Sequence, residues 1–331
     1  MGLSELLTNK WIVPKDVRPS FKGCNVIVTG ANVGLGYETA LKFVQLGANR
    51  VVLAVRTLSK GEEAKRQVES KTGRTGVAEV WQLDMLNYDS IKAFADKATK
   101  DFDHLDIACL NAGIAGLSYQ ESDYGYERTM QVNVLSTTLL ALLLMPKLKA
   151  SRTATYTPVL EMVGSSNAGL VSKLHSDRTP FASYNTPTGF GKVGVQYNVS
   201  KLFVLYVQAG LVDLAKNKES GNPDVFIPVV CPGATNSELG REVKAWLVLR
   251  VLLWLFEVLI QRTTEEGART YISGIDQGEK THGEFWKDDK IRAPAPLMAG
   301  EKGKQLRATV WEEVVDALAK DVPEVRQLVG T

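Results

Sequence analysis

The chain has 331 residues, enough for one large domain or two small ones, with ordinary apolar (44%) and charged (23%) content. A formal net charge of +2, without any long run of Lys or Arg, argues against a nucleic-acid partner. Three widely separated cysteines, Cys24, Cys109 and Cys231, argue against a disulfide framework and a metal site. They favour a reducing compartment, and with no secretory signal in the first residues we expect a cytoplasmic protein.

Short apolar runs rich in β-branched residues alternate with helical patterns along the chain. The runs predict strands at 25–30, 50–56, 77–84, 105–113, 159–166, 224–233 and 283–286. The helical patterns lie at 34–47, 59–71, 88–100, 123–149, 190–217, 262–278 and 301–320. This alternation predicts an α/β protein with a doubly wound parallel sheet that is buried on both faces.

We expect a single domain with additions at both ends. The domain covers residues 23–290. Residues 1–22 form an N-terminal extension, and residues 291–331 form a C-terminal loop and helix.

The stretch TGANVGLG, residues 29–36, follows the first predicted strand and opens the first predicted helix. Its three glycines permit a tight turn, and the helix N-terminus offers free N–H groups to a pyrophosphate. The spacing G-x-x-x-G-x-G differs from the G-x-G-x-x-G of other dinucleotide folds. In this strand–turn–helix context it still predicts a dinucleotide site. The residues placed in it are Gly30, Asn32, Gly34, Leu35 and Gly36.

The second predicted strand ends without the acidic residue that would bind a ribose 2′-hydroxyl. Val55 stands at that place and Arg56 follows it. Because a guanidinium binds phosphate in a fixed fork, this arrangement favours a 2′-phosphate, and hence NADP(H) over NAD(H). A surface arginine without a binding role is the alternative.

Tyr197 and Lys201, in the stretch YNVSK, lie one turn apart in a predicted helix and share a face. The pair alone does not distinguish a proton donor beside an ammonium from an ordinary half-buried tyrosine. The decision depends on the other motifs of the chain.

Seven short motifs occur at predicted strand and helix ends in one order. They are TGANVGLG, LDMLN (83–87), LNAG (110–113), QVNVLS (131–136), VGSSNAG (163–169), YNVSK (197–201) and CPGATNS (231–237). With this set the chain resembles the short-chain dehydrogenases/reductases, a family with a Rossmann fold, over residues 22–285. The phrases GYETA, RTTEEGART and WEEVVDA are similar to the retinol-dehydrogenase-like branch, which includes fungal enzymes of specialised metabolism.

The resemblance implies a role for each matching residue. Asn133 would help to hold a proton-relay water, and Ser166 would hydrogen-bond the substrate oxygen, with its neighbour Ser165 left open as the alternative. Tyr197 would exchange a proton with that oxygen, and Lys201 would bind the nicotinamide ribose. The further cofactor-binding residues that the resemblance implies are Asp84 and Met85 toward the adenine, Asn111, Ala112 and Gly113 after the fourth strand, and Pro232, Gly233 and Thr235 at the nicotinamide end.

The implied mechanism needs a perturbed tyrosine. Free tyrosine has a pKa of about 10 and is a poor proton shuttle at neutral pH. A nearby ammonium, together with the positive nicotinamide of the oxidised cofactor, favours the phenolate, so we expect Lys201 to lower the pKa of Tyr197. In reduction, a hydride would pass from nicotinamide C4 to a carbonyl carbon while Tyr197 protonates the oxygen.

The substrate side departs from the family pattern. Between Ser166 and Tyr197 the chain carries a long loop, 170–196, rich in Pro, Gly, Ser and Thr, which we expect to act as a lid with the segment 114–119 beside it. The apolar stretch AWLVLRVLLWLFEVLI, 245–260, is too short to span a bilayer and predicts a lid helix within 237–261. A homodimer contact and a membrane-surface contact are its alternative interpretations.

The leading functional prediction is an NADPH-dependent ketoreductase that acts on a bulky apolar carbonyl compound, such as a specialised metabolite. An NADP-dependent dehydrogenase that oxidises a retinol- or steroid-like alcohol is the second interpretation, because the same site works in both directions. A non-catalytic nucleotide sensor is the third, since fold alone does not prove activity.

Overall fold

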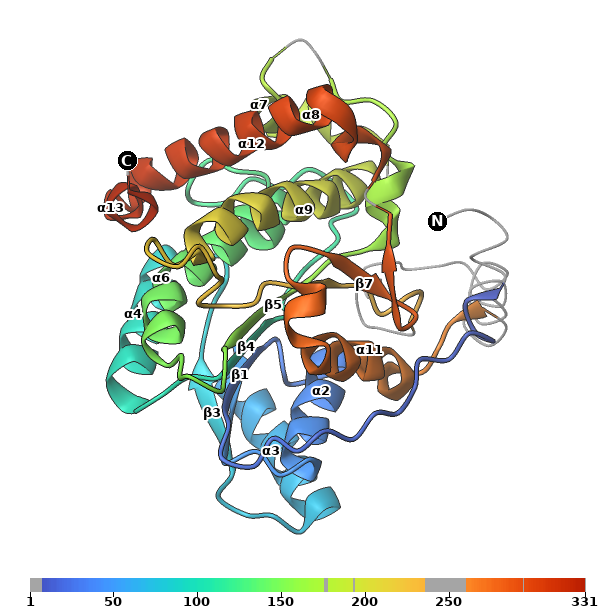
Figure 1. The fold of residues 1–331 in the computed structure, drawn as a ribbon. Coiled ribbons are helices and arrows are strands. Elements are labelled where there is room, and N and C mark those ends of the chain that lie inside the picture. The colour runs from blue at the N-terminus through green and yellow to red at the C-terminus, as the bar shows by residue number, and fades with distance from the viewer. Residues whose placement is uncertain (1–7, 176–177, 193, 236–259, 294, 331) are drawn as a thin grey trace.

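The computed structural model describes residues 8–175, 178–192, 194–235, 260–293 and 295–330. Within them, one eight-stranded sheet has the strand order β3-β2-β1-β4-β5-β6-β7-β8 (Figure 1). The strands are β1 (Asn25–Thr29), β2 (Arg50–Val55), β3 (Ala78–Gln82), β4 (Ile107–Leu110), β5 (Val159–Val163), β6 (Val229–Val230), β7 (Phe285–Lys287) and β8 (Lys290–Arg292). All neighbours from β3 to β7 pair in parallel, and β7 and β8 form an antiparallel edge hairpin. The doubly wound α/β prediction is confirmed.

Helices cover both faces of this sheet (Figure 1). They are α2 (Gly34–Gln45), α3 (Leu58–Thr72), α4 (Tyr88–Asp101), α5 (Arg128–Met130), α6 (Thr137–Ala150), α7 (Pro180–Ser183), α8 (Pro187–Phe190), α9 (Val195–Ala215), α11 (Thr264–Asp276), α12 (Gly300–Asp321) and α13 (Val325–Val329). A π-helix, η1 (Gln131–Ser136), joins α5 to α6, and short 3₁₀ turns are η2 (Ser166–Leu170), η4 (Gly278–Thr281) and η5 (Pro296–Met298).

The alternation of side chains along each strand explains the two helical layers. On β1, Ile27 belongs to the core shared with α4, α6, α9 and α12, whereas Val26 and Val28 belong to the core shared with α2, α3 and α11. All three side chains are completely buried. Successive residues of a strand point to opposite faces, so a continuous apolar run supplies both cores at once.

Two elements differ from the sequence-based expectations, and a third lies outside the described residues. The predicted helix 123–149 contains the π-helix η1, a distortion that often marks functional sites, and Asn133 lies in it. The predicted strand 224–233 is reduced to two residues, because Pro228 and Pro232 flank β6 and cannot donate to a ladder. The predicted lid helix 237–261 lies outside the described residues except for 260–261.

The long loop 170–196 is tied to the C-terminal helix. Glu313 of α12 accepts hydrogen bonds from the backbone N–H groups of Phe181 (2.9 Å) and Ala182 (3.3 Å) and from the Thr179 hydroxyl. Phe181 is itself buried in the main core. The C-terminal addition therefore belongs to the same packed body as the predicted lid.

One stretch of helix in the described part of the chain, Arg128–Ala150, is long and apolar enough to cross a membrane. In its most apolar window 89% of the residues are buried inside the protein, as is usual for a core helix.

Candidate active site

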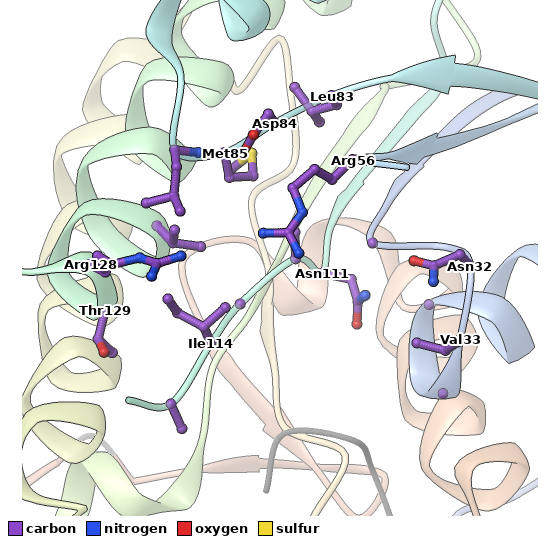
Figure 2. Close-up of a pocket in the computed structure, with 18 of the residues that line it drawn as sticks. Asn32, Val33, Arg56, Leu83, Asp84, Met85, Asn111, Ile114, Arg128 and Thr129 are labelled. Atoms are coloured by element: carbon purple, nitrogen blue, oxygen red, sulfur yellow. Dashed lines mark hydrogen bonds between the residues drawn. The ribbon is translucent and has the colours of Figure 1, made fainter. Parts of the chain in front are cut away.

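A pocket of about 430 Å³ opens where β1, β2, β3 and β4 end (Figure 2). It is built from the loops that follow these four strands, as expected where carboxyl ends of parallel strands meet. Its wall contains the predicted cofactor residues Gly30, Asn32, Gly34, Leu35, Gly36, Arg56, Asp84, Met85, Asn111, Ala112 and Gly113.

The glycine turn is held close to the loop after β4. A Cβ on Gly36 would overlap the carbonyl oxygen of Gly30 and lie 2.6 Å from Asn111 Nδ2, so no larger residue fits there. Helix α2 starts at Gly34, and its N-cap residue, Val33, makes no side-chain capping bond. The first N–H groups of α2 are thus available to an anion, as a pyrophosphate site requires.

The side chain of Asn111 links the glycine turn to helix α11 through hydrogen bonds. Its Nδ2 donates to the carbonyl oxygen of Thr29 (2.8 Å), and its Oδ1 accepts from the hydroxyl of Tyr271 (3.0 Å). The backbone N–H of Ala112 donates to the Thr29 hydroxyl (2.9 Å). Tyr271, on α11, was missed by the sequence analysis because a buried aromatic on a helix gives no local sign of its distant partner.

The pocket presents positive side chains toward its interior. Figure 2 shows Arg56 and Arg128 pointing toward each other across the pocket, and Lys60 also lines it. Within the described residues, Arg56 forms no hydrogen bond or ion pair with protein groups, whereas Arg128 Nη1 donates to Gln120 Oε1 (2.7 Å). An exposed guanidinium without a protein partner, beside a lysine, suits a phosphate group.

The predicted catalytic residues adjoin the pocket at Gly113. A Cβ built on Gly113 would lie 3.2 Å from Asn133 Oδ1 and 3.7 Å from Lys201 Nζ. Asn133 is fixed by the backbone of Ile114, whose N–H donates to Oδ1 and whose carbonyl oxygen accepts from Nδ2, both at 2.9 Å. Its Nδ2 also donates to Ser200 Oγ on α9 (3.0 Å).

Tyr197 and Lys201 lie in the first two turns of α9. Lys201 Nζ donates to the carbonyl oxygen of Val163, at the end of β5 (2.7 Å), and lies 5.7 Å from the centroid of the Tyr197 ring. The strand end, the helix and Asn133 thus converge on one place, which the motif order alone suggested.

The two candidate serines have different neighbours. Ser165 hydrogen-bonds the hydroxyl of Tyr197, and its Oγ accepts the N–H of Asn167 (3.2 Å). Ser166 lies against Cys231, with its N–H and its Oγ at 3.3 and 3.5 Å from the sulfur. Both hydroxyls therefore lie just after β5. That of Ser165 is next to Tyr197, and that of Ser166 is next to the loop after β6.

The loop after β6 approaches the glycine turn from the other side. A Cβ on Gly267 of α11 would lie 2.5 Å from Thr235 Cγ2, 2.7 Å from Leu35 Cδ2 and 3.3 Å from Pro232 Cβ. The predicted nicotinamide-end residues therefore lie beside the start of α2. Gly233 continues this loop with a positive φ of 78°.

The pKa of Tyr197 differs from the expectation. Burial raises it to about 12, and the hydrogen bond from Ser165 lowers it only in part. The expected lowering by Lys201 is not seen, and burial lowers the pKa of the Lys201 ammonium itself to about 8. Desolvation therefore dominates at both groups, and a cationic ligand would act against it at the tyrosine.

The lowered pKa of Lys201 predicts a pH-dependent stability. Between pH 8 and 10.5 the unfolded chain binds this proton and the folded protein releases it, so the free energy of unfolding should rise with pH. Lys201→Met removes the effect. The wild type should gain roughly 3 kcal/mol relative to Lys201→Met over this range, measured by urea unfolding of both proteins at several pH values. A constant difference between the two proteins would contradict the buried, desolvated position of the ammonium.

Solved structures support the same fold. An uncharacterised protein of Mycobacterium paratuberculosis superposes with a TM-score of 0.61 at 22% identity, covering 95% of this chain and 96% of its own. A short-chain dehydrogenase/reductase of Burkholderia phymatum in complex with NAD has a TM-score of 0.58 at 16% identity, covering 80% of this chain and 89% of its own. The Pseudomonas aeruginosa RhlG/NADP complex has a TM-score of 0.55 at 23% identity, covering 75% and 87%.

Sequence relatives extend over nearly the whole chain. The short-chain dehydrogenase/reductase ffsI of Aspergillus flavipes is 38% identical over 96% of this chain and 92% of its own length. The short-chain dehydrogenase/reductase phmF of Phaeosphaeria nodorum is 36% identical over the same shares. The family model for short chain dehydrogenases matches residues 24–172. The chain belongs to the short-chain dehydrogenase/reductase family of oxidoreductases, which bind a nicotinamide cofactor.

Proposed function

We propose that the protein is an NADPH-dependent ketoreductase that reduces a carbonyl group of a bulky, apolar compound, such as a specialised metabolite. The observation that carries the proposal is the convergence of Asn133, Tyr197 and Lys201 beside Gly113, at one end of the pocket formed by the predicted dinucleotide residues. The fungal relatives are consistent with a role in specialised metabolism.

The described residues fit a phosphorylated dinucleotide. The uncapped start of α2 and the close approach at Gly36 suit a pyrophosphate, and Arg56 with Lys60 suits a 2′-phosphate. Asp84 and Met85 would border the adenine. The cofactor, when bound, supplies a hydride at its nicotinamide, and the protein positions it and handles the proton.

The proton step belongs to Tyr197. A phenol with a raised pKa is protonated at neutral pH and can donate to a carbonyl oxygen that gains negative charge. Ser166 would hydrogen-bond the same oxygen, and Ser165 would orient the phenol and lower its pKa. Lys201, anchored to the carbonyl oxygen of Val163, would bind the ribose hydroxyls and supply positive charge when protonated.

The substrate side favours a large apolar molecule. Tyr119, in the segment after β4, packs edge-on against Phe190 of the long loop, with ring centroids 6.4 Å apart. Two of the predicted pocket walls therefore meet. The third predicted wall, the helix within 237–261, carries Trp246, Leu249 and Trp254, and it lies outside the described residues, as do the dimer and membrane-surface interpretations tied to it.

Two other features bear on the setting and the direction of the reaction. The three cysteines are free thiols, which suits the reducing, cytoplasmic setting that we propose. The same residues would serve alcohol oxidation with the proton moving the other way, so the cofactor pool decides the direction. A nucleotide sensor is disfavoured because Tyr197 and Lys201 are both present and adjacent.

The first test combines a labelled cofactor with a tyrosine variant. NADPH deuterated at the transferable C4 position is incubated with the protein and a metabolite extract of the source organism, followed by mass spectrometry. We expect a metabolite that gains deuterium with the wild type. With Tyr197→Phe the rate should fall by about 10²- to 10⁴-fold, because the general acid is lost, while NADPH affinity changes little. Undiminished transfer by Tyr197→Phe would refute the mechanism.

The second test concerns cofactor choice. Arg56→Ala should weaken NADPH binding by roughly 10- to 100-fold, the loss expected for a hydrogen bond to a charged group, and leave NADH binding within about twofold. Both affinities are measured by cofactor fluorescence. Arg66→Ala, on the exposed surface of α3, removes the same charge outside the pocket and should change neither affinity. Equal losses for NADPH and NADH in Arg56→Ala would eliminate the 2′-phosphate role.

The third test separates the two serines by pH profile. Ser166→Ala should lower kcat by about 10²-fold without moving the pH dependence, because a donor to the reacting oxygen is lost. Ser165→Ala removes a hydrogen bond that lowers the pKa of Tyr197, so the alkaline limb of the reduction profile should move to higher pH. If the two variants show the opposite phenotypes, Ser165 is the substrate-binding serine.

A further inference from the structure

The N-terminal segment reaches the loop that follows β6 and bonds to it directly. Asn9 is 2% exposed, and its whole carboxamide is used. Oδ1 accepts the N–H of Ala234 (3.1 Å), and Nδ2 donates to the carbonyl oxygens of Ala234 (2.8 Å) and Ile260 (3.0 Å). Asn9 thus bonds both backbone groups of Ala234, as a neighbouring strand would do.

A buried arginine joins the same parts. Arg262 is 1% exposed. Its guanidinium donates to the carbonyl oxygens of Asn9 (Nε, 2.8 Å) and Pro232 (Nη1, 3.1 Å), and to that of Ile12 through Nη2. It also pairs with Asp288 Oδ1 (2.5 Å). A buried charge is tolerated when its donors are satisfied, so the backbone of the N-terminal segment is part of what permits Arg262 to be there.

These contacts join residues 231–235 to residues 260–262. The chain leaves the sheet at 231–235 and returns at 260–262, where Thr235 and Arg262 form a parallel bridge and the N–H of Arg262 donates to the Ala234 carbonyl oxygen (2.9 Å). Asn9 donates to one residue of each segment, Ala234 in the first and Ile260 in the second. A Cβ on Gly233 would overlap Asn9 Oδ1, so the loop lies against the asparagine with no spare room.

The loop 231–235, which Asn9 and Arg262 contact, lies beside the candidate serine Ser166 and the glycine turn. Cys231, at its start, contacts Ser166, and Pro232 and Thr235 lie beside Leu35 of the glycine turn. A shift of this loop would move the wall of the nicotinamide end while leaving the pocket around Arg56 and Asp84 unchanged.

We propose that residues 8–12 form a clasp that positions the 231–235 loop at the nicotinamide end of the site, with Asn9 and Arg262 as positioning residues. The proposal rests on the proposed cofactor chemistry for the role of that loop. The clasp acts on the placement of the nicotinamide and not on the adenosine end, which is a distinction that binding experiments can resolve.

The test uses the full-length chain and two probes. NADPH reports on the whole site, through its affinity and the blue shift of its nicotinamide fluorescence, and 2′,5′-ADP reports on the adenosine end alone. In Asn9→Ala we expect NADPH to bind about tenfold more weakly with a smaller blue shift, and 2′,5′-ADP to bind within about twofold of the wild type. Hydrogen exchange of the 228–235 backbone should become faster. Unchanged NADPH affinity and exchange, or equal losses for both probes, would overturn the proposal.

Two further variants keep the result interpretable. Asn217→Ala removes a comparable set of hydrogen bonds, to Glu219 N, Ser220 N and Asp224, in the loop after α9, and should alter neither probe. If Asn9→Ala does not fold, Arg262→Lys is used, because it keeps the charge beside Asp288 and loses the fork of bonds to the carbonyl oxygens. It should show the same split between the probes.

The test of the clasp does not depend on whether the protein uses NADPH or NADH. If the wild type binds NADH and not NADPH, the cofactor proposal fails, and the same comparison is made with NADH and 5′-AMP. A split between those two probes in Asn9→Ala would still support the clasp, and its absence would still refute it.

Discussion

Burial of a parallel sheet on both faces is the constraint on which the rest of this structure depends. The central strands β1, β4 and β6 are fully buried, so polar side chains from this part of the sheet reach a pocket where the strands end. The loops after β1, β2, β3 and β4 line the proposed dinucleotide pocket, the two serines follow β5, and the loop after β6 lies at the proposed nicotinamide end. The candidate site therefore forms at the edge of the sheet where the parallel strands end, and the sequence motifs lie in the segments that meet there.

Three ionisable groups are buried in this fold, and each has a different environment. Lys201 has a lowered pKa and a single backbone acceptor, which keeps a proton available close to working pH. Burial raises the pKa of Glu161, on β5, well above its usual range, and its Oε1 accepts a hydrogen bond from the Cys109 thiol (3.4 Å). The Arg262 guanidinium is surrounded by backbone carbonyl oxygens and the Asp288 carboxylate. Lys201 lies at the candidate active site, Glu161 lies in the strand that precedes the two serines, and Arg262 bonds the loop after β6.

The sequence predicted the sheet, its direction and most of the pocket, because these depend on local patterns. The β-branched run that ends in glycine predicts the turn that contains Gly30 and Gly36. The lack of an acidic residue before Arg56 can be read from the adjacent positions of the sequence. Tyr271, Asn9 and Arg262 could not be found in this way. Each of the three has a hydrogen-bond partner 160 or more positions away, and no periodicity encodes such a pairing. The pKa of Tyr197 was predicted in the wrong direction for the same reason, since the extent of desolvation is a property of the assembled core.

The two chain ends have a role that the family pattern does not describe. The family model matches residues 24–172 and ends within the first residues of the long loop, so the matched part contains every residue that lines the proposed dinucleotide pocket. Beyond it, Glu313 of the C-terminal helix caps the short helix in that loop, while Asn9 from the other end of the chain fixes the loop after β6. The two additions thus contact two different segments near Tyr197, the proposed catalytic tyrosine. Glu313 and Asn9, which bond to these two segments, both lie outside the residues that the family model matches.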